Sequence, residues 1–224
     1  MHRHFDEELS ALNHKVLKMS ILVLSTIQRS VQALGDRDVA LAQNIIAGDT
    51  EIDRLENEID DDVLNMIALH QPVASDLRFL TTALKVNADL ERIADLSVDI
   101  CERVMELAPQ PLLKPLIDIP KLSVIAQDMV KKATDAYVRR DVELARHVCL
   151  ADAQADKLRD LIQEELISRY MAQDAKTASR AVPLLFIARY LERICDHATN
   201  IAEDVVYMVE AKVIKHHHEE LGEA

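Results

Sequence analysis

The chain has 224 residues, of which 49% are apolar and 3% aromatic, and it contains only three glycines and six prolines. This composition excludes a fold rich in β-hairpins, whose turns need Gly, Asn and Pro, and predicts long helices around an aliphatic core. The formal net charge of −13 argues against nucleic acid or an anionic membrane surface as a direct partner, because both repel an acidic protein. Cations and basic surfaces of other proteins are the favoured partner classes, and we expect contact with a membrane only through protein partners.

Two periodic segments open the chain. We expect the first helix to span residues 5–34 and to end at Gly35, a natural C-terminal cap. Asp36 or Asp38 then caps a second helix, whose apolar residues recur at spacings of three and four. The apolar positions of this second helix are Leu41, Ile45, Ile52, Leu55, Ile59, Val63 and Met66.

A third helix and a linker follow. Gln71-Pro72 ends the second helix, and the third begins at Ser75 or Asp76 and runs to about residue 107, close to 50 Å at 1.5 Å per residue. Proline removes the backbone N–H and restricts φ, so a stretch crowded with prolines predicts a linker. The linker prolines are Pro109, Pro111, Pro115 and Pro120.

The second half of the chain repeats the first. Residues 37–55 align with 140–158 at a shift of 103, with eight identities in nineteen positions, and residues 90–100 align with 191–201 at a shift of 101. We therefore predict an all-α fold of two tandem, homologous, antiparallel three-helix bundles with six long helices. The predicted boundaries are 1–108 for the first repeat, 109–120 for the linker, 121–212 for the second repeat and 213–224 for a C-terminal tail.

Each repeat carries two pairs of acidic residues at a spacing of four. Residues four apart lie on one face of a helix, where like charges repel each other. Asp53 and Glu91 are each 19 residues from Pro72, so an antiparallel hairpin turning there brings them to one level. The same symmetry holds in the second repeat about Asp174, in a predicted loop. The paired residues are Asp49 with Asp53, Glu91 with Asp95, Asp152 with Asp156, and Glu192 with Asp196.

Four carboxylates gathered at one level predict a metal site in each repeat. Oxygen donors suit hard or borderline cations such as Mg²⁺, Mn²⁺ or Fe, and the absence of a thiol from the set disfavours Zn. Asp99 and Asn200, one turn further, are candidates to extend these sites. The alternative is a solvated acidic surface in which the carboxylates pair with neighbouring basic residues. Those basic residues are Arg54, Arg92, Lys157 and Arg193.

Histidines and cysteines are weaker candidates. We expect His147 and His197 to be surface or capping residues, and the run at 216–218 to be a solvated tail or a tag remnant. The three cysteines form no C-x-x-C pair and fall within helical patterns, which predicts reduced, packed thiols. The first residues lack the apolar stretch of a signal peptide, and the longest apolar run, 181–188, is too short to span a bilayer. A cytoplasmic location is therefore expected.

A carboxylate-bridged di-metal oxidase or metal store is an alternative function, because helical bundles host such centres. These sites usually carry a Glu-x-x-His pair, and no histidine in the chain has Glu three residues before it. A purely structural helical spacer is a third possibility. With only three glycines, neither a phosphate-binding glycine loop nor a nucleophile elbow is expected.

Several motifs resemble the PhoU family of phosphate-transport accessory proteins. They are Glu91-Arg92-Ile93-Ala94-Asp95, its counterpart at 192–196, the segment Gln71-Pro72-Val73-Ala74-Ser75-Asp76-Leu77-Arg78, and Gly48-Asp49. The resemblance covers about residues 5–210. The family commonly has Gly before the last acid of the first motif, where this chain has Ala94 and Cys195.

The resemblance implies more than the residue patterns do. It implies two similar three-helix bundles, multinuclear metal centres held by the eight paired acids, and a homodimer. It further implies a non-enzymatic role at the cytoplasmic face of the membrane, where such proteins restrain phosphate uptake and phosphate-starvation signalling. The partners implied are the ATPase subunit of the phosphate ABC importer and a sensor histidine kinase.

Overall fold

The computed structural model describes residues 2–213, with side chains from residue 4 onward. The histidine run at 216–218 and all but the first residue of the predicted tail lie outside the described residues. All regular structure within 2–213 is helical, so the all-α prediction is confirmed. In that range no helix combines the length and apolar character needed to cross a membrane.

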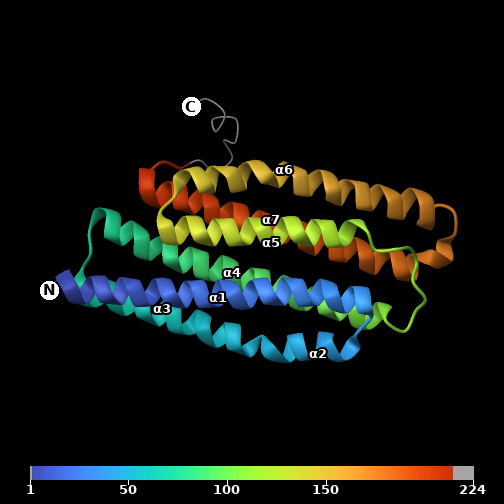
Figure 1. Ribbon diagram of the computed structural model, residues 1–224, viewed down its shortest axis with the longest axis horizontal. Helices are drawn as coiled ribbons and strands as arrows, with labels where there is room; N and C mark the ends of the chain where they lie inside the picture. Colours follow the sequence, from blue (N-terminus) through green and yellow to red (C-terminus); the bar gives the residue numbers. More distant parts are fainter. Residues whose placement is uncertain (1, 214–224) are drawn as a thin grey trace.

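The first repeat contains α1 (His2–Asp36), α2 (Val39–Gly48), α3 (Thr50–His70) and α4 (Ala74–Leu107). The second contains α5 (Asp118–Arg139), α6 (Val142–Glu165), a π turn (Leu166–Met171), a 3-10 turn (Ala175–Thr177) and α7 (Ala178–Glu210). Figure 1 shows an elongated molecule in which successive helices run antiparallel, except α2 and α3, which follow each other in the same direction.

The second helix differs from its prediction. It is divided at Asp49, so that α2 and α3 run end to end along one edge of the molecule (Figure 1). Gly48 lies at the break, and glycine weakens a helix interior by about 1 kcal/mol relative to alanine. The equivalent residue in the second repeat is Ala151, and there α6 is continuous. The predicted second turn is confirmed, because the chain reverses between the end of α6 and Ala178.

The two repeats begin their second helices in the same way. Asp38 accepts a hydrogen bond from the Leu41 amide at 2.9 Å, which confirms it as the N-terminal cap of α2. The prediction that Gly35 ends α1 is wrong. The helix continues to Asp36, and Arg37 adopts the left-handed conformation with φ of 58°. Its guanidinium donates to linker carbonyls, including that of Ala108, so a long-range contact selects this residue.

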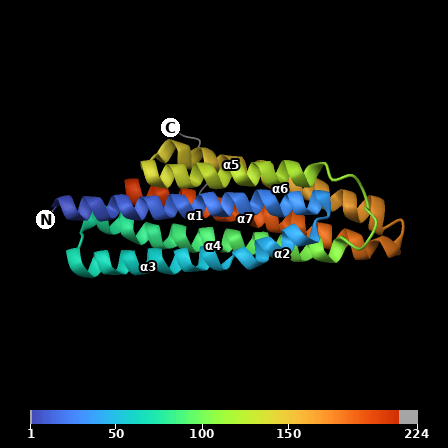
Figure 2. The ribbon, with the colours of Figure 1, turned by 60° about the horizontal axis from the view of Figure 1, so that its bottom comes forward.

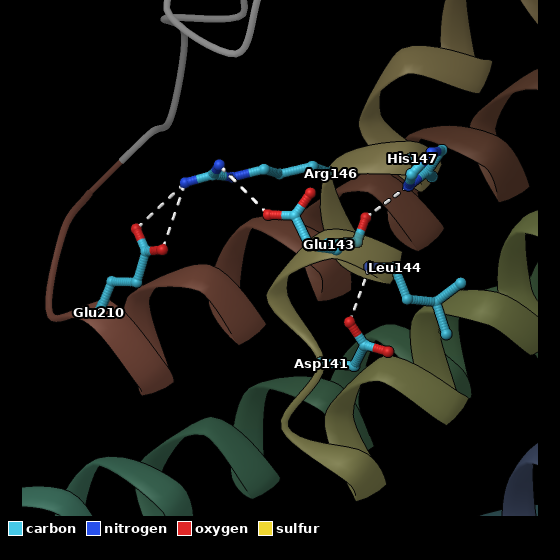
Figure 3. A network of polar contacts seen from close by, with 6 residues as sticks. All are labelled: Asp141, Glu143, Leu144, Arg146, His147 and Glu210. Atoms are coloured by element: carbon cyan, nitrogen blue, oxygen red, sulfur yellow. Dashed lines mark hydrogen bonds and ion pairs between the residues drawn. The ribbon is translucent and has the colours of Figure 1, made fainter. Parts of the chain in front are cut away.

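The start of α6 is anchored to the end of α7 (Figure 3). Asp141 caps α6 by accepting from the Leu144 amide at 3.0 Å. Arg146 pairs with Glu143 in its own helix at 3.4 Å and with Glu210 of α7 at 3.2 Å. His147 Nδ1 lies 2.7 Å from the Glu143 carbonyl oxygen. This ring is therefore engaged with its own helix, in agreement with the surface role expected for it.

One hydrophobic core runs through both repeats. The long helices α4 and α7 lie side by side in the middle of the molecule, and α1 packs against α5 (Figures 1 and 2). Phe79 of α4 stacks on Tyr137 of α5, across the boundary between the two repeats, with ring centroids 5.1 Å apart. Each fully buried aliphatic or aromatic side chain contributes about 2 kcal/mol of transfer free energy, so the shared core binds the repeats together. The predicted boundaries of the two repeats and the linker stay predictions.

The predicted core of the second helix is largely confirmed. The buried side chains recur at spacings of three and four along α2 and α3, and Leu41 packs at the edge of the core. Pro120 lies in the first turn of α5, where a missing backbone N–H costs nothing. All three cysteines are free and buried, as expected of packed thiols.

Candidate functional site

Two acidic clusters lie at equivalent places in the two repeats. The first cluster comprises Asp49, Asp53, Glu56, Glu91 and Asp95, contributed by the α2–α3 break, α3 and α4. The second cluster comprises Asp152, Asp156, Glu192 and Asp196, contributed by α6 and α7.

Asp49 sits where the backbone changes direction between α2 and α3. Its carbonyl accepts from the amides of Ile52 at 2.8 Å and Asp53 at 3.2 Å, which starts α3. Its Oδ1 atom is buried and has no hydrogen-bond partner among the described residues. Burial raises the pKa of Asp49 to about 6, and repulsion from Asp53 and Asp95 adds to the rise. Asp49 of one helix and Asp95 of the next therefore lie within electrostatic range of each other, whereas the direct pairing of Asp53 with Glu91 stays a prediction.

Glu91 is the second strongly perturbed group of the first cluster. Burial raises the pKa of Glu91 to about 7, with further contributions from the charge of Asp95 and a hydrogen bond to it. Arg92 reaches both carboxylates, at 3.6 Å and 3.4 Å, but its side chain is 64% exposed. Solvent screens such a pair, so the arginine offsets little of the repulsion.

Glu56 belongs to the first cluster although the sequence analysis missed it. It interacts with Asp53 on its own helix and with Glu91 and Asp95 across the hairpin, and burial raises its pKa. It thereby connects Asp53 to Glu91, which the hairpin symmetry placed at one level. Its position three residues after Asp53 places Glu56 on the same helix face, and this spacing could have indicated its membership in the cluster.

The second cluster joins acids of α6 and α7. Asp156 of α6 interacts with both Glu192 and Asp196 of α7. All four carboxylates, Asp152 included, act on the buried thiol of Cys195 between them, whose pKa is raised first by burial and then by these charges. Asp156 therefore lies within electrostatic range of the two α7 acids, and the gathering of all four second-repeat acids into one site stays a prediction.

Arginines accompany the second cluster. Glu192 is only 5% exposed, and its Oε1 atom accepts from Arg159 at 3.4 Å and from Arg189 at 3.0 Å. Its Oε2 atom is buried, and no described residue offers it a hydrogen bond. Burial still raises the pKa of Glu192. At the shifts that relate the repeats, Arg159 corresponds to Glu56 and Arg189 to Ala88, so the second cluster carries positive charge that the first lacks.

The donor sets suit a hard cation. Both clusters offer only carboxylate oxygens, and each has one buried acceptor atom, on Asp49 and on Glu192, that a cation would satisfy. Within residues 2–213 no three acidic, His or Cys side chains already converge on a single point. A bound cation would have to draw the carboxylates closer together, so metal binding by the eight predicted residues stays a prediction.

The additional candidates fall into two groups. Asp99 lies next to Asp95, and burial raises its pKa, so it extends the acidic surface of the first cluster. His197 Nδ1 lies 2.8 Å from Oδ1 of Asp89, a carboxylate outside both clusters, and this contact joins α7 to α4.

The PhoU domain family model matches residues 16–104 and again residues 119–205. The chain belongs to the PhoU family. A phosphate-specific transport system accessory protein PhoU homolog of Aquifex aeolicus is 39% identical over 218 residues, covering 97% of this chain and 98% of that protein. A second homolog, from Thermotoga maritima, is 35% identical and covers 99% of this chain and 94% of its own length.

Solved structures of the PhoU family share the fold. The crystal structure of PhoU from Pseudomonas aeruginosa superposes with a TM-score of 0.88 at 34% identity, covering 93% of this chain and all of that one. The phosphate transport system regulatory protein PhoU from Streptococcus pneumoniae gives the same TM-score at 26% identity, with 94% and 99% covered. The two matches of the PhoU domain model fall on the two repeats described above.

Proposed function

We propose that this chain is a regulatory accessory protein of phosphate transport. Its relatives are named as accessory proteins of the phosphate-specific transport system, and they match nearly its full length. A structural relative is named as a regulatory protein of that system. These names describe proteins that regulate and assist a transporter, which favours a non-enzymatic role for this chain.

In finer detail, the proposed role is that of a metal-loaded cytoplasmic adaptor. It contacts the ATPase subunit of the phosphate ABC importer and a sensor histidine kinase, acts as a homodimer, and restrains both phosphate uptake and the starvation response. The observation that supports the metal is the buried, unpaired oxygen of Asp49 within a cluster of like charges. A Mg²⁺, Mn²⁺ or Fe ion would neutralise that repulsion and complete the missing interaction.

The protein's own residues would divide the work at each centre. Asp49, Glu91 and Glu192 supply partly desolvated carboxylates, which bind a cation more strongly than exposed ones do because little water competes. Asp53, Asp95, Asp152, Asp156 and Asp196 supply the remaining oxygens. The di-metal oxidase alternative has less support, because His147 and His197 are both engaged elsewhere.

The test is metal-dependent stability of the chain prepared without affinity tag or chelator. Addition of Mn²⁺ or Fe²⁺ should raise the melting temperature, since a ligand at about 100 times its dissociation constant stabilises the native state by about 2.7 kcal/mol. The double variant E91Q/E192Q should lose most of this shift. E143Q, which alters an exposed carboxylate outside both clusters, is the control.

Three further measurements decide between the proposed functions. Elemental analysis of the same preparation should find Mn, Fe or Mg, and co-purification with the importer ATPase and the kinase should be lost in E91Q/E192Q. Unchanged partner binding by this variant would remove the metal from the mechanism. Oxygen consumption above that of the chelator-treated protein would favour the oxidase instead.

A further inference from the structure

An apolar groove lies on the outer face of the hairpin formed by α5 and α6. It has a volume of about 520 Å³. Val124 is 65% exposed there and Leu161 is 61% exposed, and both side chains line the same groove. The residues that line it, which we call the α5–α6 groove, are Lys121, Val124, Ile125, Gln154, Lys157, Leu158 and Leu161.

On the same face of the first repeat, Ile21 stands in the place of Val124 and is equally exposed, at 66%, but the positions around it carry ion pairs. Because Arg37-Asp38 and Arg140-Asp141 end and cap equivalent helices, a shift of 103 relates α1 to α5 as well as α3 to α6. Ion pairs bridge α1 and α3 on this face. They are Lys18 with Glu51 at 3.6 Å, Lys15 with Glu58 at 3.7 Å, and Lys15 with Asp62 at 2.6 Å.

The second repeat lacks two of the acidic residues that form these ion pairs. Gln154 stands where the first repeat has Glu51, and Leu161 stands where it has Glu58. Lys121 pairs instead with Asp118 of its own helix, at 2.9 Å. Lys157 forms no ion pair with any described residue, whereas its counterpart Arg54 pairs with Glu58 at 2.8 Å. The groove thus combines exposed apolar side chains with two lysines that no other helix neutralises.

We propose that the α5–α6 groove binds an amphipathic helix of a partner protein, with carboxylates flanking the apolar stripe of that helix. Two antiparallel helices with an apolar seam offer the groove into which a third helix packs. The lysines select acidic flanks, and they stand out on a chain whose net charge is −13. Asp118 and Glu164 line the adjoining pocket, so a basic residue at one end of the partner helix would set its direction.

Other occupants fit these observations less well. A second copy of the chain docked groove to groove would bring the lysines of both copies together, where they repel each other, and a contact with a different surface would form a ring or a filament. An anionic lipid surface is repelled by the acidic protein. The inference rests on the proposed adaptor function and deepens it by giving the adaptor a docking surface. It does not depend on metal.

The experiment uses the full chain in EDTA and a labelled helical peptide of about 18 residues, with leucines at spacings of three and four. One peptide carries Glu on both flanks of the leucine stripe, and its twin carries Lys at the same positions. In a fluorescence anisotropy titration the acidic peptide should bind at least about tenfold more tightly than the basic one. It should also protect Lys121 and Lys157 from acetylation, but not Lys18.

Two matched variants test whether the peptide binds at the α5–α6 groove. Q154E/L161E installs the first-repeat residues and should weaken binding of the acidic peptide by at least about tenfold. The mirror variant E51Q/E58L should leave binding at the α5–α6 groove unchanged. Circular dichroism melts establish that both variants remain folded, as expected for surface substitutions.

Four outcomes would overturn the proposal. They are equal binding of the two peptides, full binding by Q154E/L161E, self-association that this variant abolishes in sedimentation, and binding to phosphatidylglycerol vesicles that it abolishes. Because the titration is done in EDTA, a failed Mn²⁺ melting test leaves this result standing, and failure of the peptide leaves the metal proposal standing.

Discussion

The two acidic clusters occupy equivalent places in the two repeats, yet their charges are balanced differently. The first cluster has Glu56 among its carboxylates and an exposed Arg92 at its edge. In the second cluster, Arg159 takes the place of Glu56, and Arg189 adds a further partner for Glu192. The helical framework is shared, but the second cluster is partly neutralised by the protein itself while the first is left to protons or cations.

The two clusters also differ in the backbone that carries them. Gly48 at the α2–α3 break corresponds to Ala151 within the continuous α6. Asp49 therefore begins a new helix, whereas Asp152 lies within one. Under the metal-binding proposal, the first cluster should bind cations more strongly than the second and should be the less stable of the two when no cation is present.

The largest expected effect comes from giving the second cluster the charge of the first. R159E removes one of the two partners of the buried Glu192 carboxylate and adds a like charge beside it. We expect the free energy of unfolding in EDTA to fall by about 3 kcal/mol, measured by urea denaturation at pH 8. The mirror substitution E56R should raise it by about 1 kcal/mol. If R159E is as stable as the parent protein, the arginines do not account for the difference between the clusters.

A smaller effect on the free energy of unfolding is expected from protonation of Asp49 and Glu91 in the first cluster. The raised pKa values of Asp49, about 6, and Glu91, about 7, mean that the folded state holds protons which the unfolded state releases. The free energy of unfolding should therefore fall as the pH rises from about 4 to about 7, by about 2 kcal/mol in EDTA after a reduction for solvent screening of these partly exposed carboxylates. D49N/E91Q should flatten this dependence and be the more stable protein above pH 7. E143Q should keep the slope of the parent, and an equal slope in D49N/E91Q would contradict the assignment.

The smallest effect concerns the helix break. A Cβ atom at Gly48 would meet nothing within 4 Å, and its φ is not positive. G48A should therefore stabilise the protein by about 0.5 kcal/mol through reduced chain entropy and better helix propensity. The reverse change, A151G, should destabilise α6 by a similar amount, measured by thermal melting. If G48A is destabilising, the break is imposed by packing and not by the glycine.

Much of the site could be predicted, because its determinants are local. Acid pairs at a spacing of four share a helix face, and an antiparallel hairpin about Pro72 brings Asp49 to Asp95. The cap at Asp38 and the buried side chains of α3 follow from equally short-range patterns. The roles of Glu56 and Arg159 could not be predicted in this way, since each depends on a contact with the following helix.

The sequence by itself determined the all-helical class, the duplication and the level at which the acids meet, because helix periodicity and turn residues act over a few positions. Only the tertiary structure decided which carboxylates are buried without partners and which arginines reach them. It also decided that α1 ends at Asp36 and that Arg37, not Gly35, adopts the left-handed conformation there. The Arg37 guanidinium donates to the carbonyl of Ala108. Burial and pairing depend on side chains that are distant along the chain, and their free energies override local preference.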